Sequence, residues 1–255
     1  MEKNKEYTYS FFKSGYPEWK RKRDGLIIRY IFRPISFFVA GIAARHNISA
    51  NQISFFSLLI ATVRAVLYLP NSITSHIIGA LFIVFWLILD CTDGAIARSV
   101  KQQSYGDFAD GISSYGLINF LFICLGVAAY QTDGMLIGKN TYWIIALGGA
   151  AGAFDSLARL IYQKFAATEL KLQLDGKIKA EERSDANNQK GIQGLYRKVM
   201  RELGILGLFI PALILCTCMQ WLDVFVIFYF VMYTITLVGT LYSLIRKVLK
   251  INANE

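Results

Sequence analysis

The chain has 255 residues, 55% of them hydrophobic, and its mean hydropathy is +0.40. Apolar content this high and this continuous excludes an ordinary soluble domain and indicates an integral membrane protein. The formal net charge of +9 comes from basic residues that flank the apolar runs, so we expect membrane lipids as partners and no nucleic acid.

The first 50 residues precede the long apolar runs and combine aromatic with basic residues. The basic run at positions 20–23 lies among aromatic residues, a composition typical of a segment at the lipid headgroups. Residues 25–46 are apolar but are interrupted by Arg29, Arg33 and Arg45. Each central arginine would cost roughly 2.5–3.5 kcal/mol in a spanning helix, so we predict an amphipathic helix on the membrane surface.

Six apolar runs follow, and each approaches the roughly 20 residues that a membrane-spanning helix needs. The runs cover residues 51–69, 73–99, 107–130, 141–166, 203–222 and 224–245. We therefore predict an all-α membrane protein in which a cytoplasmic N-terminal segment, residues 1–50, precedes a six-helix transmembrane domain, residues 51–255. The charged stretch at about 168–202 is predicted to be a cytoplasmic loop, since basic residues favour that side of an inner or plasma membrane.

Several polar residues inside the spans have two interpretations each. Arg64 either has a structural role or contacts a substrate. Asp155 and Arg159 are four residues apart, which favours an ion pair within one helix, but they could also line a polar cavity. Gly148 and Gly152 form a small-x-x-x-small face that predicts close helix packing.

The end of the second predicted span carries the sequence DCTDGAIAR, residues 90–98. In a helix, Asp90 and Asp93 share one face with the small residues Gly94 and Ala97. After a short polar turn the same spacing recurs, at Asp107, Asp110, Gly111 and Ser114. A single aspartate at a helix end can simply cap the helix or face water, but converging carboxylates need neutralising. Hard divalent cations with oxygen ligands are their natural partners.

This stretch resembles the signature of the CDP-alcohol phosphotransferase family, D-x-x-D-G-x-x-A-R, a spacer, then G-x-x-x-D-x-x-x-D. Residues 90–98 match the first half in full, and Gly106 and Asp110 match the start of the second half. The spacer is one residue shorter than the usual form, and Ser114 occupies the position of the last aspartate. The resemblance extends best over the surface helix and the first four spans.

The resemblance implies a metal-dependent membrane transferase of phospholipid synthesis. Two Mg²⁺ or Mn²⁺ ions would be held by Asp90, Asp93 and Asp110. A CDP-alcohol or a CDP-diacylglycerol-like donor would transfer its phosphoryl-alcohol group to an alcohol acceptor and release CMP. The family is usually homodimeric, and the glycine face of the fourth span adds support for a homodimer. The candidate substrate contacts are Gly94, Ala97, Arg98, Gly106, Asn51 and Arg159.

The serine at position 114 leaves the catalytic base open. In the family the last aspartate is thought to deprotonate the acceptor hydroxyl or help hold the second metal, and a serine does neither well. Asp107, on the same helical face as Asp110, can replace it, or the acceptor or a bound water can supply the base. We therefore consider Asp107, Asp110 and Ser114 as the catalytic positions. A homologue that binds CDP-lipid and metal without turnover is the alternative, and a transporter is a more distant one.

Overall fold

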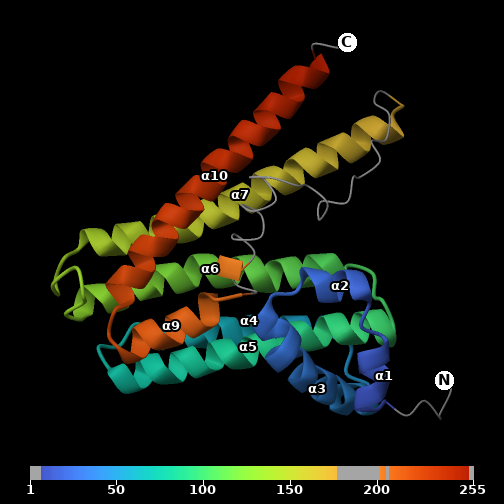
Figure 1. Ribbon diagram of the computed structural model, residues 1–255, viewed down its shortest axis with the longest axis horizontal. Coiled ribbons are helices and arrows are strands. Elements are labelled where there is room, and N and C mark those ends of the chain that lie inside the picture. The colour runs from blue at the N-terminus through green and yellow to red at the C-terminus, as the bar shows by residue number, and fades with distance from the viewer. Residues whose placement is uncertain (1–6, 177–201, 205–206, 253–255) are drawn as a thin grey trace.

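The computed structural model describes residues 7–176, 202–204 and 207–252, and the regular secondary structure of these residues is entirely helical (Figure 1). The elements in chain order are α1 (Tyr9–Ser14), α2 (Glu18–Arg23), the π-helical turn η1 (Ile28–Phe32), α3 (Arg33–Arg45), α4 (Ala50–Val66), α5 (Ile73–Ser99), α6 (Gly106–Gln131), α7 (Trp143–Leu174), α9 (Phe209–Cys218) and α10 (Leu222–Asn252). The all-α prediction is confirmed for this part of the chain.

Several of these helices are long and apolar enough to cross a membrane. Among the described residues, three qualify outright, Ile73–Ser99, Trp143–Leu174 and Leu222–Leu249. A fourth crossing is added if the segments Ile28–Arg45 and Ala50–Val66, which meet at a bend of 120°, form one broken span. The apolar helices Ile118–Gln131 and Phe209–Cys218 are shorter. The structure thus supports three or four spans, and the count of six stays a prediction.

Most predicted boundaries lie within a few residues of the observed ones, with three corrections. Helix α10 continues to Asn252, seven residues past the predicted end of the last span at 245. Helix α7 continues to Leu174, so the predicted loop at 168–202 begins too early. Its extra turns contain good helix formers, and Glu169 pairs with Lys247 of α10 at 2.6 Å. Helix α9 occupies only Phe209–Cys218 of the predicted span 203–222. The rest of the predicted loop, residues 177–201, lies outside the described residues.

The sharp bend between α3 and α4 follows from local sequence. Asn47 takes the left-handed conformation with φ of 57°, which ends α3, and asparagine tolerates this conformation well. The Ser49 hydroxyl then caps α4 by accepting from the backbone N–H of Gln52, while the Gln52 side-chain oxygen accepts from the backbone N–H of Ser49. This capping box starts α4 in a new direction, close to the end of α5.

Helices α6 and α7 approach each other closely through the predicted glycine face. A Cβ at Gly152 would lie 2.8 Å from the Asn119 Cα, and one at Gly148 would overlap the Phe122 carbonyl oxygen. The prediction of close packing is confirmed. The partner, however, is α6 of the same chain, so this glycine face gives no support for a homodimer.

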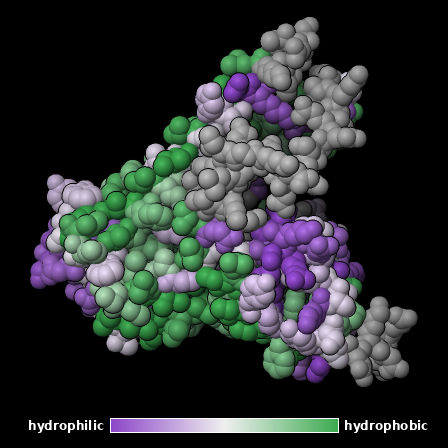
Figure 2. Space-filling view, viewed as in Figure 1, coloured by the Kyte–Doolittle hydropathy of each residue, from purple (hydrophilic) through white to green (hydrophobic). Residues whose placement is uncertain are grey.

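The face of the molecule seen in Figure 2 has an apolar flank with hydrophilic groups at its edges. Figure 2 shows apolar residues over the flank of the bundle and hydrophilic residues around the N-terminal helices, with a second hydrophilic group at the opposite end. At that opposite end, the buried Asp223 carboxylate accepts backbone N–H bonds of 3.1, 2.6 and 3.0 Å, from Met135, Leu136 and Ile137. The start of α10 is thereby tied to the α6–α7 loop.

Candidate functional site

The first acidic pair lies on the last third of α5, at the polar end of this long apolar helix. Asp93 is buried, and its Oδ2 accepts a hydrogen bond of 2.6 Å from the Ser54 hydroxyl on α4. Asp90 is half-buried one turn earlier. Because α5 is helical through Ser99, the backbone places Asp90, Asp93, Gly94 and Ala97 on one face, as the spacing predicted.

The guanidinium of Arg98 covers the glycine of the motif. A Cβ at Gly94 would lie 2.9 Å from Arg98 Nη1 and 3.3 Å from Nη2. The space that the missing side chain leaves is therefore taken by the end of a flexible cationic group. The charge of Asp93 acts on this guanidinium, as do the charges of Asp24 and Arg33. A guanidinium beside a carboxylate pair is suited to contact a phosphate group.

Asn51 fixes the turn that joins the two halves of the motif. Its backbone N–H donates to Gln103 Oε1 at 2.9 Å, and its Nδ2 donates to the Ser104 carbonyl at 3.3 Å. Tyr105 follows in the left-handed conformation with φ of 63°. Gly106 then begins α6, where a Cβ would lie 3.9 Å from Asn51 Oδ1. The two predicted substrate contacts Asn51 and Gly106 are thus neighbours, and the Asn51 amide already has a structural partner.

The second half of the motif lies in the first turns of α6. The backbone of this helix places Asp107, Asp110 and Ser114 on one face, near the end of α5 (Figure 1). The side chains of these three residues lie outside the described part of the structure, so their predicted catalytic and metal-binding roles stay predictions.

The described donors fit a hard divalent cation. Asp90 and Asp93 offer carboxylate oxygens on one helical face, and the Ser54 hydroxyl orients one of them. Among the described side chains, no group of three or more histidine, cysteine, aspartate or glutamate residues comes together. The side chains of the other predicted carboxylates, Asp107 and Asp110, are not among the described ones, so this statement does not cover them.

Arg64 lies deep inside the bundle and away from any surface. Its side chain is only 1% exposed, and its guanidinium carbon is 4.9 Å from the centre of the Trp86 ring. Within the described part of the chain, Nε and Nη2 have no hydrogen-bond partner, and the adjoining space has no room for a water molecule. The charge of Asp90 acts on this group. These observations favour the structural interpretation over a substrate contact.

The ion pair predicted on the fourth span is present. Arg159 Nε lies 2.8 Å from Asp155 Oδ2, and the aspartate is buried while the arginine side chain is 40% exposed. The intrahelical interpretation is therefore confirmed for this pair. A contact between Arg159 and the substrate stays a prediction.

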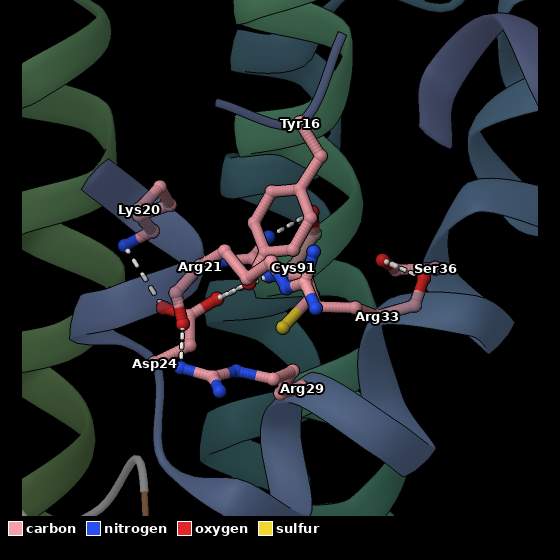
Figure 3. Close-up of polar contacts among 8 residues, drawn as sticks. All are labelled: Tyr16, Lys20, Arg21, Asp24, Arg29, Arg33, Ser36 and Cys91. Atoms are coloured by element: carbon pink, nitrogen blue, oxygen red, sulfur yellow. Dashed lines mark hydrogen bonds and ion pairs between the residues drawn. The ribbon is translucent and has the colours of Figure 1, made fainter. Parts of the chain in front are cut away.

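A buried polar cluster that sequence reasoning missed lies where the N-terminal segment and α3 meet α5 (Figure 3). Arg33 Nε donates to Asp24 Oδ2 at 2.6 Å, the Tyr16 hydroxyl donates to the same oxygen at 2.7 Å, and Lys20 Nζ lies 3.5 Å from Oδ1. Arg33 Nη1 reaches α5 and donates to the Cys91 carbonyl at 3.2 Å. The sequence signal was only an arginine that interrupts an amphipathic pattern.

The charges of this cluster shift the ionisation of its members. Burial and the Asp24 carboxylate raise the pKa of Tyr16 to about 12. Burial alone would raise the pKa of Asp24, but the hydrogen bond and charge of Arg33, with the charge of Lys20, hold that pKa below its ordinary value. Asp24 is therefore an ionised carboxylate at neutral pH, paired with a buried cation.

A model of the family described as CDP-alcohol phosphatidyltransferase matches residues 47–181. This match covers more than half of the 255 residues and includes both halves of the acidic motif. A search of curated proteins finds no significant match.

Proposed function

The chain belongs to the CDP-alcohol phosphatidyltransferase family, and we propose that it transfers a phosphatidyl group from a CDP-linked donor to an alcohol acceptor within a membrane. The observation that carries this proposal is the acidic face of α5, where Asp93 is oriented by Ser54 and Arg98 folds over Gly94. A carboxylate pair and a cation at the polar end of an apolar helix suit a diphosphate that is attached to a lipid.

In this proposal the acidic residues neutralise the diphosphate through metal ions. Asp90, Asp93 and Asp110 would hold two Mg²⁺ or Mn²⁺ ions, which supply charge neutralisation and polarise the phosphorus when bound. Ser54 would keep the Asp93 carboxylate in one orientation. Arg98 would leave Gly94 and donate to a phosphate oxygen, and Gly94 and Ala97 would leave room for the nucleotide.

The reaction exchanges one P–O bond for another. The acceptor hydroxyl oxygen forms a bond to the phosphorus that carries the donor's lipid or alcohol group. The anhydride bond to the cytidine phosphate breaks, and its electron pair leaves with CMP. The hydroxyl proton needs a base, and Ser114 is a poor one. We propose that Asp107 accepts this proton, because it lies one turn before Asp110 on the same face of α6.

The location follows from the same reasoning. We propose a multi-pass protein of the plasma or inner membrane whose acidic end faces the cytoplasm, because the basic N-terminal segment lies at that end. We also propose that α3 lies on the membrane surface, since one of its faces packs on α5 and the other exposes apolar residues. A homodimer is proposed from the family alone.

The test is CMP release by the purified full-length protein in detergent, with and without Mg²⁺. The donors are CDP-diacylglycerol and a soluble CDP-alcohol, each offered with a panel of alcohol acceptors. We expect metal-dependent release that falls by about 100-fold or more in Asp93→Asn. Asp107→Asn is tested in parallel, and full activity in that variant would show that Asp107 is not the base.

The second candidate is a protein that binds the CDP-linked lipid and metal without turnover, and Ser114 is the observation that favours it. Ser114→Asp distinguishes the two functions. If no donor and acceptor pair releases CMP in the unaltered protein, which still binds the CDP-linked donor in a metal-dependent way, and Ser114→Asp gains release, the binding function is supported. If the unaltered protein is active, the transferase proposal holds.

A further inference from the structure

The buried Arg33 makes two contacts, one to the N-terminal segment and one to α5. The side chains of Arg33 and Asp24 are only 6% and 1% exposed, and their ion pair of 2.6 Å joins the first residue of α3 to the end of α2. The second contact, from Nη1 to the Cys91 carbonyl, crosses to α5. One guanidinium therefore connects the N-terminal arm, which we define as residues 7–24, to Cys91 in the acidic stretch of α5 (Figure 3).

The point of attachment is the acidic turn, residues 90–93, which carries both carboxylates. Cys91 lies between Asp90 and Asp93 in the sequence, so the bond from Arg33 to the Cys91 carbonyl connects this turn to α3. The next residue, Thr92, donates to the Ile88 carbonyl within α5 at 2.7 Å. Ser54 of α4 donates to the Asp93 carboxylate of the same turn. The acidic turn is thus held by α3 through Arg33 and by α4 through Ser54.

The arm also contacts the end of α5. A Cβ at Gly15 would overlap the Ser99 hydroxyl, so the backbone of the arm lies directly on the residue after Arg98. The charges of Arg33 and Asp24 act on the Arg98 guanidinium. A displacement of the arm would therefore alter both the backbone of the acidic turn and the position of the cation over Gly94.

We propose that Arg33, held in place by Asp24, is a positioning residue that fixes the acidic turn of α5 so that Asp90 and Asp93 bind a divalent cation together. This inference rests on the proposed function. Its physical reason is that a buried ion pair is costly to displace, so the pair holds the Cys91 carbonyl firmly. Hydrogen bonds behind metal ligands commonly account for 10–100-fold in metal affinity.

Arg33→Lys separates the two contacts of this residue. A lysine ammonium can keep the charge pair with Asp24, but it lacks the planar fork that reaches Asp24 and the Cys91 carbonyl at the same time. Arg29→Lys is the matched control. Arg29 lies one turn earlier, and its side chain donates to the Arg21 carbonyl within the arm rather than to α5.

The primary measurement is Mn²⁺ binding by the full-length protein in detergent, followed by electron paramagnetic resonance. Hydrogen exchange of residues 88–99 and thermal unfolding are measured on the same samples. We expect Arg33→Lys to weaken Mn²⁺ binding by about tenfold and to speed exchange in this segment, with a small change in melting temperature. Arg29→Lys should match the unaltered protein in all three.

Mn²⁺ affinity and exchange within twofold of the unaltered protein in folded Arg33→Lys would overturn the inference and leave the proposed function intact. If Arg33→Lys does not fold, Asp24→Asn replaces it, since Arg33 then keeps its donors but loses its anchor. This variant should weaken Mn²⁺ binding in the same direction, and unchanged binding would again overturn the inference. An unaltered protein that neither binds Mn²⁺ nor releases CMP would instead overturn the proposed function and this inference with it.

Discussion

Replacing Gly152 by alanine tests the packing of α7 on α6 with a single methyl group. The new Cβ would lie 2.8 Å from the Asn119 Cα and 3.1 Å from the Asn119 carbonyl oxygen, both of them backbone atoms. Ordinary van der Waals contact begins at 3.4 Å, so the two helix backbones must separate by about 0.6 Å. No flexible side chain can absorb this overlap.

The expected cost is about 1–3 kcal/mol of overpacking. Alanine is intrinsically a better helix former than glycine by about 1 kcal/mol, which would partly hide the effect. Gly149→Ala carries the same helix-forming gain three residues earlier, but its Cβ would lie 3.9 Å from its nearest neighbour, an Ile123 side-chain carbon. The difference between the two variants therefore isolates the contact with α6.

The assay is thermal unfolding of both variants in detergent, with light scattering to follow the oligomeric state. For a chain of this size we expect Gly152→Ala to melt about 3–10 °C below Gly149→Ala, with an unchanged oligomeric state. Equal melting temperatures would refute the packing argument. A Gly152→Ala variant that loses subunits without unfolding would show instead that this face joins two chains.

Three further predictions address other buried groups. Asp223→Asn should lower the free energy of unfolding by about 2–4 kcal/mol, because three backbone N–H groups lose a charged acceptor. Asp133→Asn, at an exposed position, is the control and should change this free energy by less than about 0.5 kcal/mol; equal effects would contradict the structure. Arg64→Met should melt at an equal or higher temperature, since it removes a buried cation with two unpartnered nitrogens; a clearly lower melting temperature would show that the nearby Asp90 carboxylate depends on this cation. The lowered pKa of Asp24 means that its ionised form adds stability above the ordinary value of 3.8, and this stability is lost as the pH falls through the lowered pKa. Melting temperatures measured from neutral to acid pH should therefore fall less steeply in Asp24→Asn than in the unaltered protein.

The parts of the fold that depend on local sequence could be predicted. The helix that carries residues 73–99 and the turn before Ala50 follow from apolar length and from a capping box, both of which involve neighbouring residues. The close packing at Gly148 and Gly152 was also predictable, because a small face permits a close approach. Which helix fills that face was not, since the partner lies about 30 residues away in the sequence, on α6.

The candidate site was predictable only where its spacing is local. The face shared by Asp90 and Asp93 follows from helical periodicity, whereas the hydrogen bond from Ser54 depends on how α4 packs against α5. In the sequence, Arg33 is only an interruption of a predicted surface helix. Its two partners, Asp24 of the arm and the Cys91 carbonyl, become visible only in the folded chain. A backbone carbonyl has no sequence signature, so a contact of this kind appears only in the structure.

The bonds between Asp223 and the α6–α7 loop constrain how the chain can be made. The three backbone N–H groups that donate to this carboxylate belong to residues synthesised 86 to 88 positions earlier in the chain. During translation, the hairpin of α6 and α7 must therefore exist for a time with its connecting loop unsecured, until the start of the last helix leaves the ribosome. The final helix completes the far end of the bundle, which makes its arrival the step at which a membrane quality-control system could distinguish a finished molecule from an unfinished one.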